Sequence, residues 1–349
     1  MMVEEFIKYA KEQGASDVHL VQGLPPKCRI DGEIQSMPFA PLSQEDCEAY
    51  ALELAGERMQ EMNGIGELDL AQSIAGERVR VNLFRQQGSV SAAIRILNSK
   101  IPKLYELSLP PVINEFTSWN KGIVLITGET GSGKSTTLAA LLDEINHTKN
   151  GHIITLEDPV EYVYTPDCCV INQREIGRDT KSYSDGLRAV LREDPDIILI
   201  GEMRDQITTE TALMAAETGH LVFATLHTNS APDAIDRIVG LFPAERQSQI
   251  RLELSICLRA VVSQQLLKKK SGKGRVAACE VMIVNAALRN LIREGKTPQM
   301  FSAMLSGSSE GNITMDNALL RLVMEQVIDS KTAIMAAHDR EYVKKNIKF

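Results

Sequence analysis

Gly128-Glu129-Thr130-Gly131-Ser132-Gly133-Lys134-Ser135 matches the phosphate-loop pattern G-x-x-x-x-G-K-[ST] at every fixed position. The apolar run 123–127 before this stretch predicts a buried strand, and the run 136–142 after it predicts the first turns of a helix. Glycines in such a bend let backbone N–H groups approach phosphate oxygens, and the helix N-terminus adds its positive end. The strand–loop–helix order therefore favours a nucleotide-binding loop over an ordinary glycine-rich turn.

Within this loop the residue types predict distinct roles. Lys134 is placed to reach the β- and γ-phosphates, and the Ser135 hydroxyl to hold Mg²⁺. The predicted cofactors are accordingly ATP and Mg²⁺. The residues expected to contact the nucleotide are Gly128, Glu129, Thr130, Gly131, Ser132, Gly133, Lys134, Ser135 and Thr136.

The bulk composition limits the class of protein. A chain of 349 residues exceeds one ordinary core, which predicts two domains. Hydrophobic residues make up 44% and charged residues 24%, so the chain is expected to be globular. The net charge of −8 argues against nucleic acid as the main partner, although a local basic channel stays open. The basic run 268–275 stands without aromatic neighbours and is expected to be a solvated loop.

No stretch approaches the roughly 20 apolar residues that a bilayer requires, and the N-terminus lacks the order of a signal peptide. We therefore expect a cytosolic protein, with docking on a membrane protein left open. The six cysteines include no C-x-x-C pair, so their spacing predicts reduced thiols rather than a zinc site.

Two segments with different patterns follow along the chain. Residues 1–97 predict a small α+β module, and 98–111, with three prolines, reads as a linker. In the module we expect a turn at 31–32 and one at 75–76, and Ser43 as the N-cap of the second helix. The helices are expected at 3–13 and 43–62, and the strands at 17–21, 26–30, 33–38, 67–74, 78–85 and 89–96.

From residue 112 to 349 apolar strands alternate with helices, which predicts a largely parallel sheet covered by helices on both faces. The carboxyl-terminal part is expected to be mostly helical. The strands are predicted at 123–127, 152–156, 168–172, 196–200 and 221–226, and the late helices at 245–268, 285–294, 297–305 and 315–326.

Carboxylates and a histidine follow three of these strands. Glu157, Asp158 and Glu161 come after strand 152–156, where ATP hydrolysis needs a group that orients water and ligands for Mg²⁺. Glu202, after the apolar run 197–200, is expected to meet Mg²⁺ or its water. His227 falls at the carboxyl end of its strand, on the nucleotide side, where it could sense the γ-phosphate. His220 lies more than about 20 Å away at the strand's start, so the two cannot share a metal.

Arginines gather on the strands of the first segment, at Arg78, Arg80, Arg85 and Arg95. Phosphoryl transfer gains from an arginine supplied by another subunit or domain, because the transition state spreads negative charge over the γ-oxygens. Four such residues in an acidic chain favour this role over an ordinary exposed strand face.

Several longer motifs are similar to the secretion ATPase superfamily and, within it, to the type IV pilus retraction ATPases. The resemblance runs from Ala15–Leu20 to the carboxyl-terminal helices. It is most specific in 171–180, 187–196, 201–205 and the histidine-bracketed segment 218–229. Ala287-Leu288-Arg289-Asn290-Leu291-Ile292-Arg293-Glu294 is close to the retraction motif A-I-R-N-L-I-R-E, with leucine in place of isoleucine at 288.

The resemblance implies a PAS-like first domain, a RecA-like P-loop second domain and a homohexameric ring with nucleotide between the domains. It implies that Glu161 is the catalytic glutamate and Glu202 the Walker B glutamate, and that Arg80 and Arg95 approach the phosphates. The four-cysteine zinc site of assembly ATPases is missing from the sequence, which favours retraction over assembly.

The function implied is a hexameric ATPase motor for pilus retraction, peripheral at the inner face of the cytoplasmic membrane. Its implied partners are an inner-membrane platform protein and a second retraction ATPase, with no nucleic acid. The alternatives that stay open are an accessory retraction ATPase, an assembly or type II secretion ATPase, and, from other classes, a RecA-like nucleic-acid motor, a small-molecule P-loop kinase and a non-catalytic scaffold.

Overall fold

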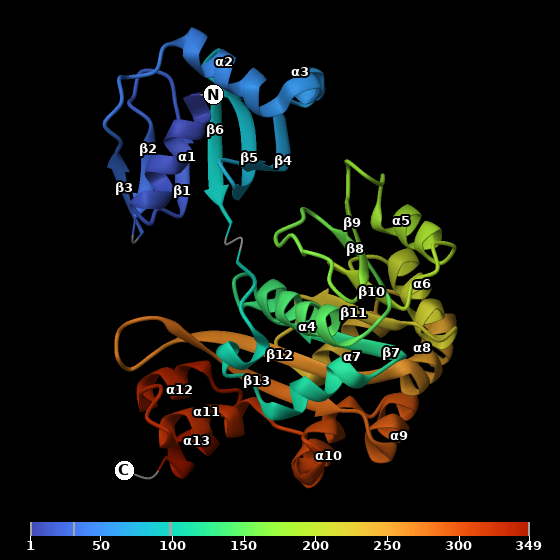
Figure 1. Cartoon of the computed structure of the whole chain (residues 1–349). Coiled ribbons are helices and arrows are strands. Elements are labelled where there is room, and N and C mark those ends of the chain that lie inside the picture. Colours follow the sequence, from blue (N-terminus) through green and yellow to red (C-terminus); the bar gives the residue numbers. More distant parts are fainter. Residues whose placement is uncertain (1, 31, 98–99, 348–349) are drawn as a thin grey trace. The chain divides into compact units, whose positions relative to one another are not determined.

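The computed structural model describes residues 2–30, 32–97 and 100–347 (Figure 1). The chain divides into two compact units. The first comprises Met1–Lys100 together with the short segment Pro159–Val163, and the second comprises Ile101–Asp158 and Tyr164–Phe349. Each unit is described separately below.

The first unit is a six-stranded antiparallel sheet with helices packed against it, in the order β3-β2-β1-β6-β5-β4. The strand order differs from the chain order because β1 pairs with both β2 and β6. Its elements are α1 (Met2–Glu12), β1 (Asp17–Leu20), β2 (Lys27–Ile30), β3 (Glu33–Ser36), α2 (Gln44–Ala55), α3 (Met59–Ile65), β4 (Glu67–Ile74), β5 (Glu77–Gln86) and β6 (Ser89–Ile96).

The alternation of apolar and polar side chains along β5 explains why one face of this sheet is buried. Val79, Val81 and Leu83 are fully buried, whereas Arg80 between them is exposed. Successive side chains of a strand point to opposite faces, so the apolar set forms the core and the arginine stays in water. The predicted strands of this unit are confirmed to within a few residues, while residue 31 of the expected turn at 31–32 lies outside the described residues.

The single helix predicted over 43–62 is wrong in its second half. Ser43 does cap α2, and its side chain and that of Asp46 form a reciprocal capping box. The helix ends at Ala55, because Gly56 adopts a positive φ of 55°, and a short 3-10 turn leads into α3. A glycine takes up such a conformation at low cost, which makes it a frequent helix terminator.

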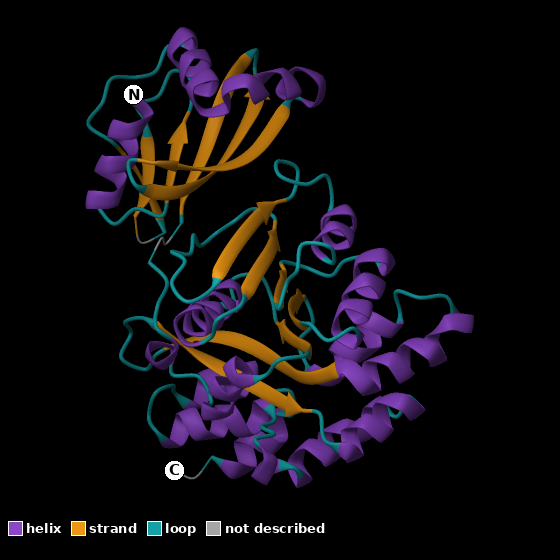
Figure 2. Cartoon of the chain, turned by 45° about the vertical axis from the view of Figure 1, so that its right-hand side comes forward, coloured by secondary structure: helices purple, strands orange, loops and turns teal. Residues whose placement is uncertain are grey.

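The second unit is built on a seven-stranded sheet in the order β13-β12-β7-β11-β10-β8-β9 (Figure 2). All neighbours are parallel except β12 and β13, which form an antiparallel hairpin. Its strands are β7 (Gly122–Thr127), β8 (His152–Glu157), β9 (Val170–Glu175), β10 (Ile197–Ile200), β11 (Leu221–Leu226), β12 (Leu258–Lys268) and β13 (Arg275–Ile283).

Helices accompany this sheet as the sequence predicts. In β7 every residue is buried, as expected for a parallel strand covered on both faces. The helices are α4 (Lys134–Thr148), α5 (Tyr183–Val190), α6 (Gln206–Glu217), α7 (Ala231–Val239), α8 (Ala244–Cys257), α9 (Ala286–Glu294), α10 (Met300–Ser306), α11 (Met315–Met324), α12 (Ser330–Ala336) and α13 (Arg340–Asn346).

The helix predicted over 245–268 is wrong beyond Cys257. There α8 ends and β12 begins, and β12 pairs in parallel with β7 over Leu258–Ser263. The partner strand β13 was not predicted at all. A buried apolar run of this kind cannot be assigned to helix or strand from periodicity alone. Here the segment forms a strand because it pairs with an edge of β7 that would otherwise lack a neighbouring strand.

Two further features concern the thiols and the membrane. Five of the six cysteines are buried and Cys168 is exposed, and all six are free thiols. Within the described residues, no helix combines the length and the apolar character needed to cross a bilayer.

Candidate active site

The predicted phosphate loop lies between β7 and α4, at the carboxyl edge of the parallel strands. Gly128, Gly131 and Gly133 have φ values of 139°, 81° and 94°, all in the region that favours glycine. A Cβ at Gly128 would collide with the carbonyl oxygen of Gln264, and one at Gly133 would lie 2.7 Å from the Gln264 Nε2. The loop therefore needs glycine at 128 for space as well as for conformation, whereas at 133 the conformation is the stronger requirement.

The donors of the loop fit a phosphate group. Gly133 is the N-cap of α4 and has no side chain that could accept a hydrogen bond from the first amides of the helix. The Lys134 Nζ donates to the carbonyl oxygens of Gly128 and Glu129, at 2.8 and 2.9 Å, which keeps the ammonium group at the loop. An anion at this helix end would gain from the N–H groups of the first helical turn and from the adjacent positive charge.

Two serine hydroxyls of the same loop also lack partners within the described residues. The Ser132 Oγ is buried without a hydrogen bond, and the Ser135 side chain is exposed at the start of α4. No group of three or more His, Cys, Asp or Glu side chains in the described chain could hold a metal ion. A magnesium ion here would therefore take most of its ligands from phosphate oxygens and water, as Mg²⁺ commonly does, with Ser135 as a fitting protein ligand.

Acidic side chains meet at the carboxyl ends of β8 and β10. The two strands are parallel neighbours with Leu156 opposite Ile200, so the residues that follow them lie at the same edge. The Glu157 Oε1 accepts hydrogen bonds from Thr155 Oγ1 at 2.6 Å and Gln173 Nε2 at 3.1 Å. Asp158 beside it is exposed.

The pKa of Tyr183, at the start of α5, is affected by the acidic side chains at this edge of the sheet. Burial raises the pKa of its hydroxyl, and the negative charges of Asp158, Glu157 and Glu202 raise it further. The structure therefore brings together these three carboxylates, which sequence reasoning placed on separate strand ends. Tyr183 itself was not singled out from the sequence, because a lone tyrosine at a helix start carries no pattern.

Glu202 is held between two basic side chains. Its Oε2 lies 2.6 Å from Arg204 Nη2, and its Oε1 lies 3.3 Å from His227 Nε2. Burial would raise the pKa of this carboxyl, but the hydrogen bond from Arg204 and the charges of His227 and Arg204 outweigh it, so the pKa is lowered. The carboxylate is thus kept ionised, as a group that binds a metal ion or its water must be.

Glu161 belongs to the segment Pro159–Val163, which is part of the first unit, where the Arg78 Nε donates to the Val160 carbonyl oxygen at 3.0 Å. The Glu161 side chain is half-buried and makes no hydrogen bond or ion pair within the described residues. The role assigned to it in catalysis stays a prediction.

Arg80 and Arg95 lie directly opposite each other on β5 and β6. Arg80 is ion-paired with Asp69, and the Arg95 Nε donates to Asp17 Oδ1 at 3.0 Å. Both arginines are exposed, Arg95 more than Arg80, and exposed pairs contribute only about 0–1 kcal/mol, so phosphate oxygens could compete with these carboxylates. Their predicted approach to the phosphates is not tested by the fold of the first unit.

Residues 72–329 match the type II/IV secretion system protein family. The type IV pilus retraction ATPase PilT of Pseudomonas aeruginosa is 47% identical over 335 residues, covering 95% of this chain and 97% of that protein. PilU from the same organism, a type IV pilus ATPase, is 37% identical, covering 97% and 89%. A crystal structure of the pilus retraction motor PilT with bound ADP superposes with a TM-score of 0.92 at 47% identity, covering 98% of this chain and 99% of that one. The chain belongs to the type II/IV secretion system protein family.

Proposed function

We propose that this chain is an ATP-hydrolysing hexameric motor that powers type IV pilus retraction, and hence twitching motility. The observation that carries the proposal is the 47% identity to PilT over almost the full length of both chains. The phosphate loop adds the chemistry, since its glycines, its lysine and the N-terminus of α4 suit the phosphates of a nucleotide. The PilT structure that resembles this chain was solved with ADP.

The residues divide the work as follows. Loop amides and Lys134 hold the phosphates and neutralise their charge, with Glu129, Thr130 and Thr136 around the nucleotide. Glu161 orients and deprotonates the attacking water, and Glu202, ionised through Arg204 and His227, supports the magnesium site together with Ser135. When bound, Mg²⁺ would supply charge neutralisation at the phosphates. Arg80 and Arg95 stabilise the charge that develops on the γ-oxygens.

In this proposal residues 1–97 form a PAS-like domain, 98–111 a linker and 112–349 a RecA-like ATPase domain with carboxyl-terminal helices. ATP binding and hydrolysis change the contacts of these domains around a homohexameric ring. The ring works at the inner face of the cytoplasmic membrane on an inner-membrane platform protein, with a second retraction ATPase as a further partner.

The relatives favour the main retraction ATPase over the accessory one. Identity is 47% to PilT but 37% to PilU over a similar share of this chain.

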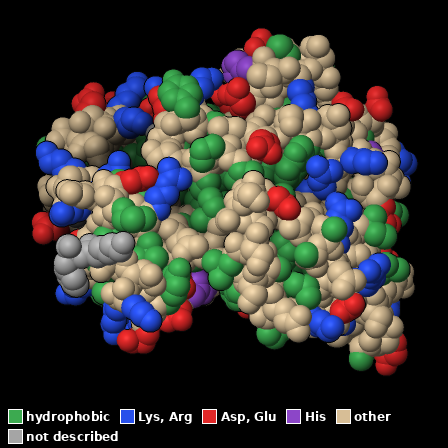
Figure 3. Space-filling model, turned by 90° about the horizontal axis from the view of Figure 1, so that it is seen from below, with side chains coloured by type: hydrophobic (Ala, Val, Ile, Leu, Met, Phe, Trp, Pro, Cys, Tyr) green, Lys and Arg blue, Asp and Glu red, His purple; other side chains and the backbone are tan. Residues whose placement is uncertain are grey.

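The face at the bottom of Figure 1, where α9, α10 and α13 are drawn, carries both acidic and basic side chains interspersed (Figure 3). Such a mixed surface offers no continuous basic track for nucleic acid.

Deletion of the gene tests the direction of the motor. Cells without a retraction ATPase are expected to carry extra surface pili that do not move the cell, because polymerised pilin can no longer be withdrawn. Counting pili by electron microscopy while scoring surface motility checks this. Bald cells would instead assign the chain to pilus assembly.

The motif at 287–294 provides a test of coupling. In α9, Leu288 and Ile292 are fully buried in the core, so deleting the segment would damage the fold, whereas Arg289 and Arg293 are exposed. The double variant R289A/R293A is expected to hydrolyse ATP within about twofold of the unchanged chain, as surface substitutions usually permit, and to stop retraction in cells. The measurements are phosphate release and twitching motility.

A matched control removes two exposed arginines from elsewhere in the same unit, R321A/R340A, which should leave both readouts intact. If R289A/R293A also lost hydrolysis, α9 would serve the fold or the active site rather than the coupling to the filament.

A further inference from the structure

Gln264, on β12, has a buried side chain that contacts the phosphate loop. The residue is only 3% exposed, and a glutamine is seldom buried to this extent unless its amide has specific hydrogen-bond partners. The Gln264 Nε2 donates to the Ser132 carbonyl oxygen at 2.8 Å, and its Oε1 accepts from Thr137 Oγ1 at 2.9 Å. One amide thus joins the end of the loop to the first turn of α4. The Ser132 carbonyl oxygen can only accept, so it requires the amide nitrogen of Gln264 to face the loop, and the Thr137 hydroxyl holds the oxygen end.

The backbone of the same residue limits the other end of the loop. The Gln264 carbonyl oxygen lies against Gly128, which therefore cannot carry a Cβ, and a Cβ at Gly133 would displace the Gln264 side-chain nitrogen. Strand β12 is the neighbour of β7, whose end leads into the loop, which explains how one residue reaches both ends.

The bond to Ser132 has a consequence for the phosphate donors. In a planar trans peptide the C=O and the next N–H point in opposite directions. Because Gln264 holds the Ser132 carbonyl on the β12 side, the Gly133 N–H points to the opposite side of the loop. Without that bond, rotation of this peptide next to a glycine could turn a carbonyl oxygen toward an anionic phosphate.

We propose that Gln264, held in place by Thr137, is a positioning residue that fixes the 132–133 peptide of the nucleotide loop in the orientation required for phosphate binding. The inference rests on the proposed nucleotide-binding function of the loop. Gln264 contacts no reacting atom, so its effect reaches the nucleotide only through the loop, and it is expected to act on nucleotide affinity more than on the chemical step.

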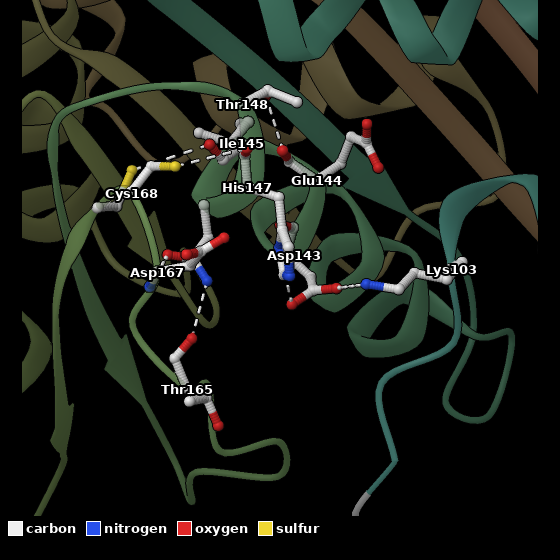
Figure 4. A network of polar contacts seen from close by, with 11 residues as sticks. Lys103, Asp143, Glu144, Ile145, His147, Thr148, Thr165, Asp167 and Cys168 are labelled. Atoms are coloured by element: carbon white, nitrogen blue, oxygen red, sulfur yellow. Dashed lines mark hydrogen bonds and ion pairs between the residues drawn. The ribbon is translucent and has the colours of Figure 1, made fainter.

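The test compares two buried amides in the full-length chain. Q264M keeps the length of the side chain and removes both hydrogen bonds. Asn146, at the other end of α4, is the matched control: it is fully buried, its Nδ2 donates to Thr165 O at 2.9 Å and its Oδ1 accepts from Asp167 N at 3.0 Å. Figure 4 shows the surroundings of this second amide, with Thr165 and Asp167. N146L removes an equivalent pair of bonds away from the loop.

For Q264M we expect the dissociation constant of MgADP, measured with a fluorescent analogue, to rise roughly 10-fold, the size of one lost hydrogen bond to a positioned group. The KM for ATP should rise with it while kcat changes much less. N146L should lower the melting temperature comparably and leave the dissociation constant unchanged. T137V, which removes only the bond to the Gln264 Oε1, should weaken MgADP binding by a smaller factor and serves if Q264M fails to fold.

Unchanged MgADP binding in Q264M, or in T137V if the former does not fold, would overturn the positioning role. An equal loss of affinity in N146L would overturn it too, because the effect would then be general destabilisation. If the unchanged chain itself bound no MgADP, the proposed function would fail and this inference with it, so the two failures are distinguishable.

Discussion

Replacing Lys134 with alanine is expected to abolish ATP hydrolysis. The Lys134 ammonium group lies at the phosphate loop, within 2.8 and 2.9 Å of the Gly128 and Glu129 carbonyl oxygens, where it would neutralise charge on the transferred phosphoryl group. Loss of one such positioned donor typically costs about 10²–10³ in rate, and loss of a full charge at least as much. Phosphate release from purified protein measures the effect.

The control for this variant is K121A, which removes an exposed lysine just before β7 and should leave the rate unchanged. Thermal melting of both variants shows whether they fold alike. Normal ATPase rates in K134A would remove the central assignment of the loop.

Glu161→Gln is expected to retain ATP binding and lose about 10²–10⁴ in turnover, the usual range for a lost general base. Glutamine keeps the shape of the side chain but cannot take a proton from water. Binding of a fluorescent ATP analogue and phosphate release, measured on the same preparation, separate the two effects.

Glu157→Gln is the comparison that decides between the carboxylates. The Glu157 carboxylate already accepts hydrogen bonds from Thr155 and Gln173, which fits a structural or orienting role, whereas Glu161 has no such partners within the described residues. We therefore expect the smaller loss of rate in E157Q. A larger loss there would move the role of the base to Glu157.

The phosphate loop and the parallel strands could be predicted because their signals are local. The motif 128–135 fixes a strand before it and a helix after it, and β7, β8, β10 and β11 all lie within one residue of their expected bounds. Glu157, Asp158 and Glu202 could be assigned to one edge because parallel strands share a direction, which is a rule of topology rather than of side-chain contact.

The support behind the loop could not be predicted, since it depends on tertiary contacts. Residues 258–268 read equally well as the continuation of α8, and only their pairing with β7 makes them a strand. On a helix over these residues, Gln264 would be an ordinary polar residue, and no sequence pattern indicates its hydrogen bonds with Ser132 and Thr137. The ion pair of Glu202 with Arg204 likewise depends on the turn after β10, whose geometry the sequence does not encode in a recognisable pattern.

Because Cys168 is exposed and the other five cysteines are buried, the native chain can be labelled at one site with a fluorescent dye. A maleimide dye should react at Cys168 and spare the five buried cysteines. Cys168 precedes β9, at the amino edge of the parallel strands, whereas the phosphate loop lies at the carboxyl edge, so the fluorophore would stand clear of bound nucleotide. Energy transfer between labelled copies could then follow the motions of an assembly during turnover, without any engineered cysteine.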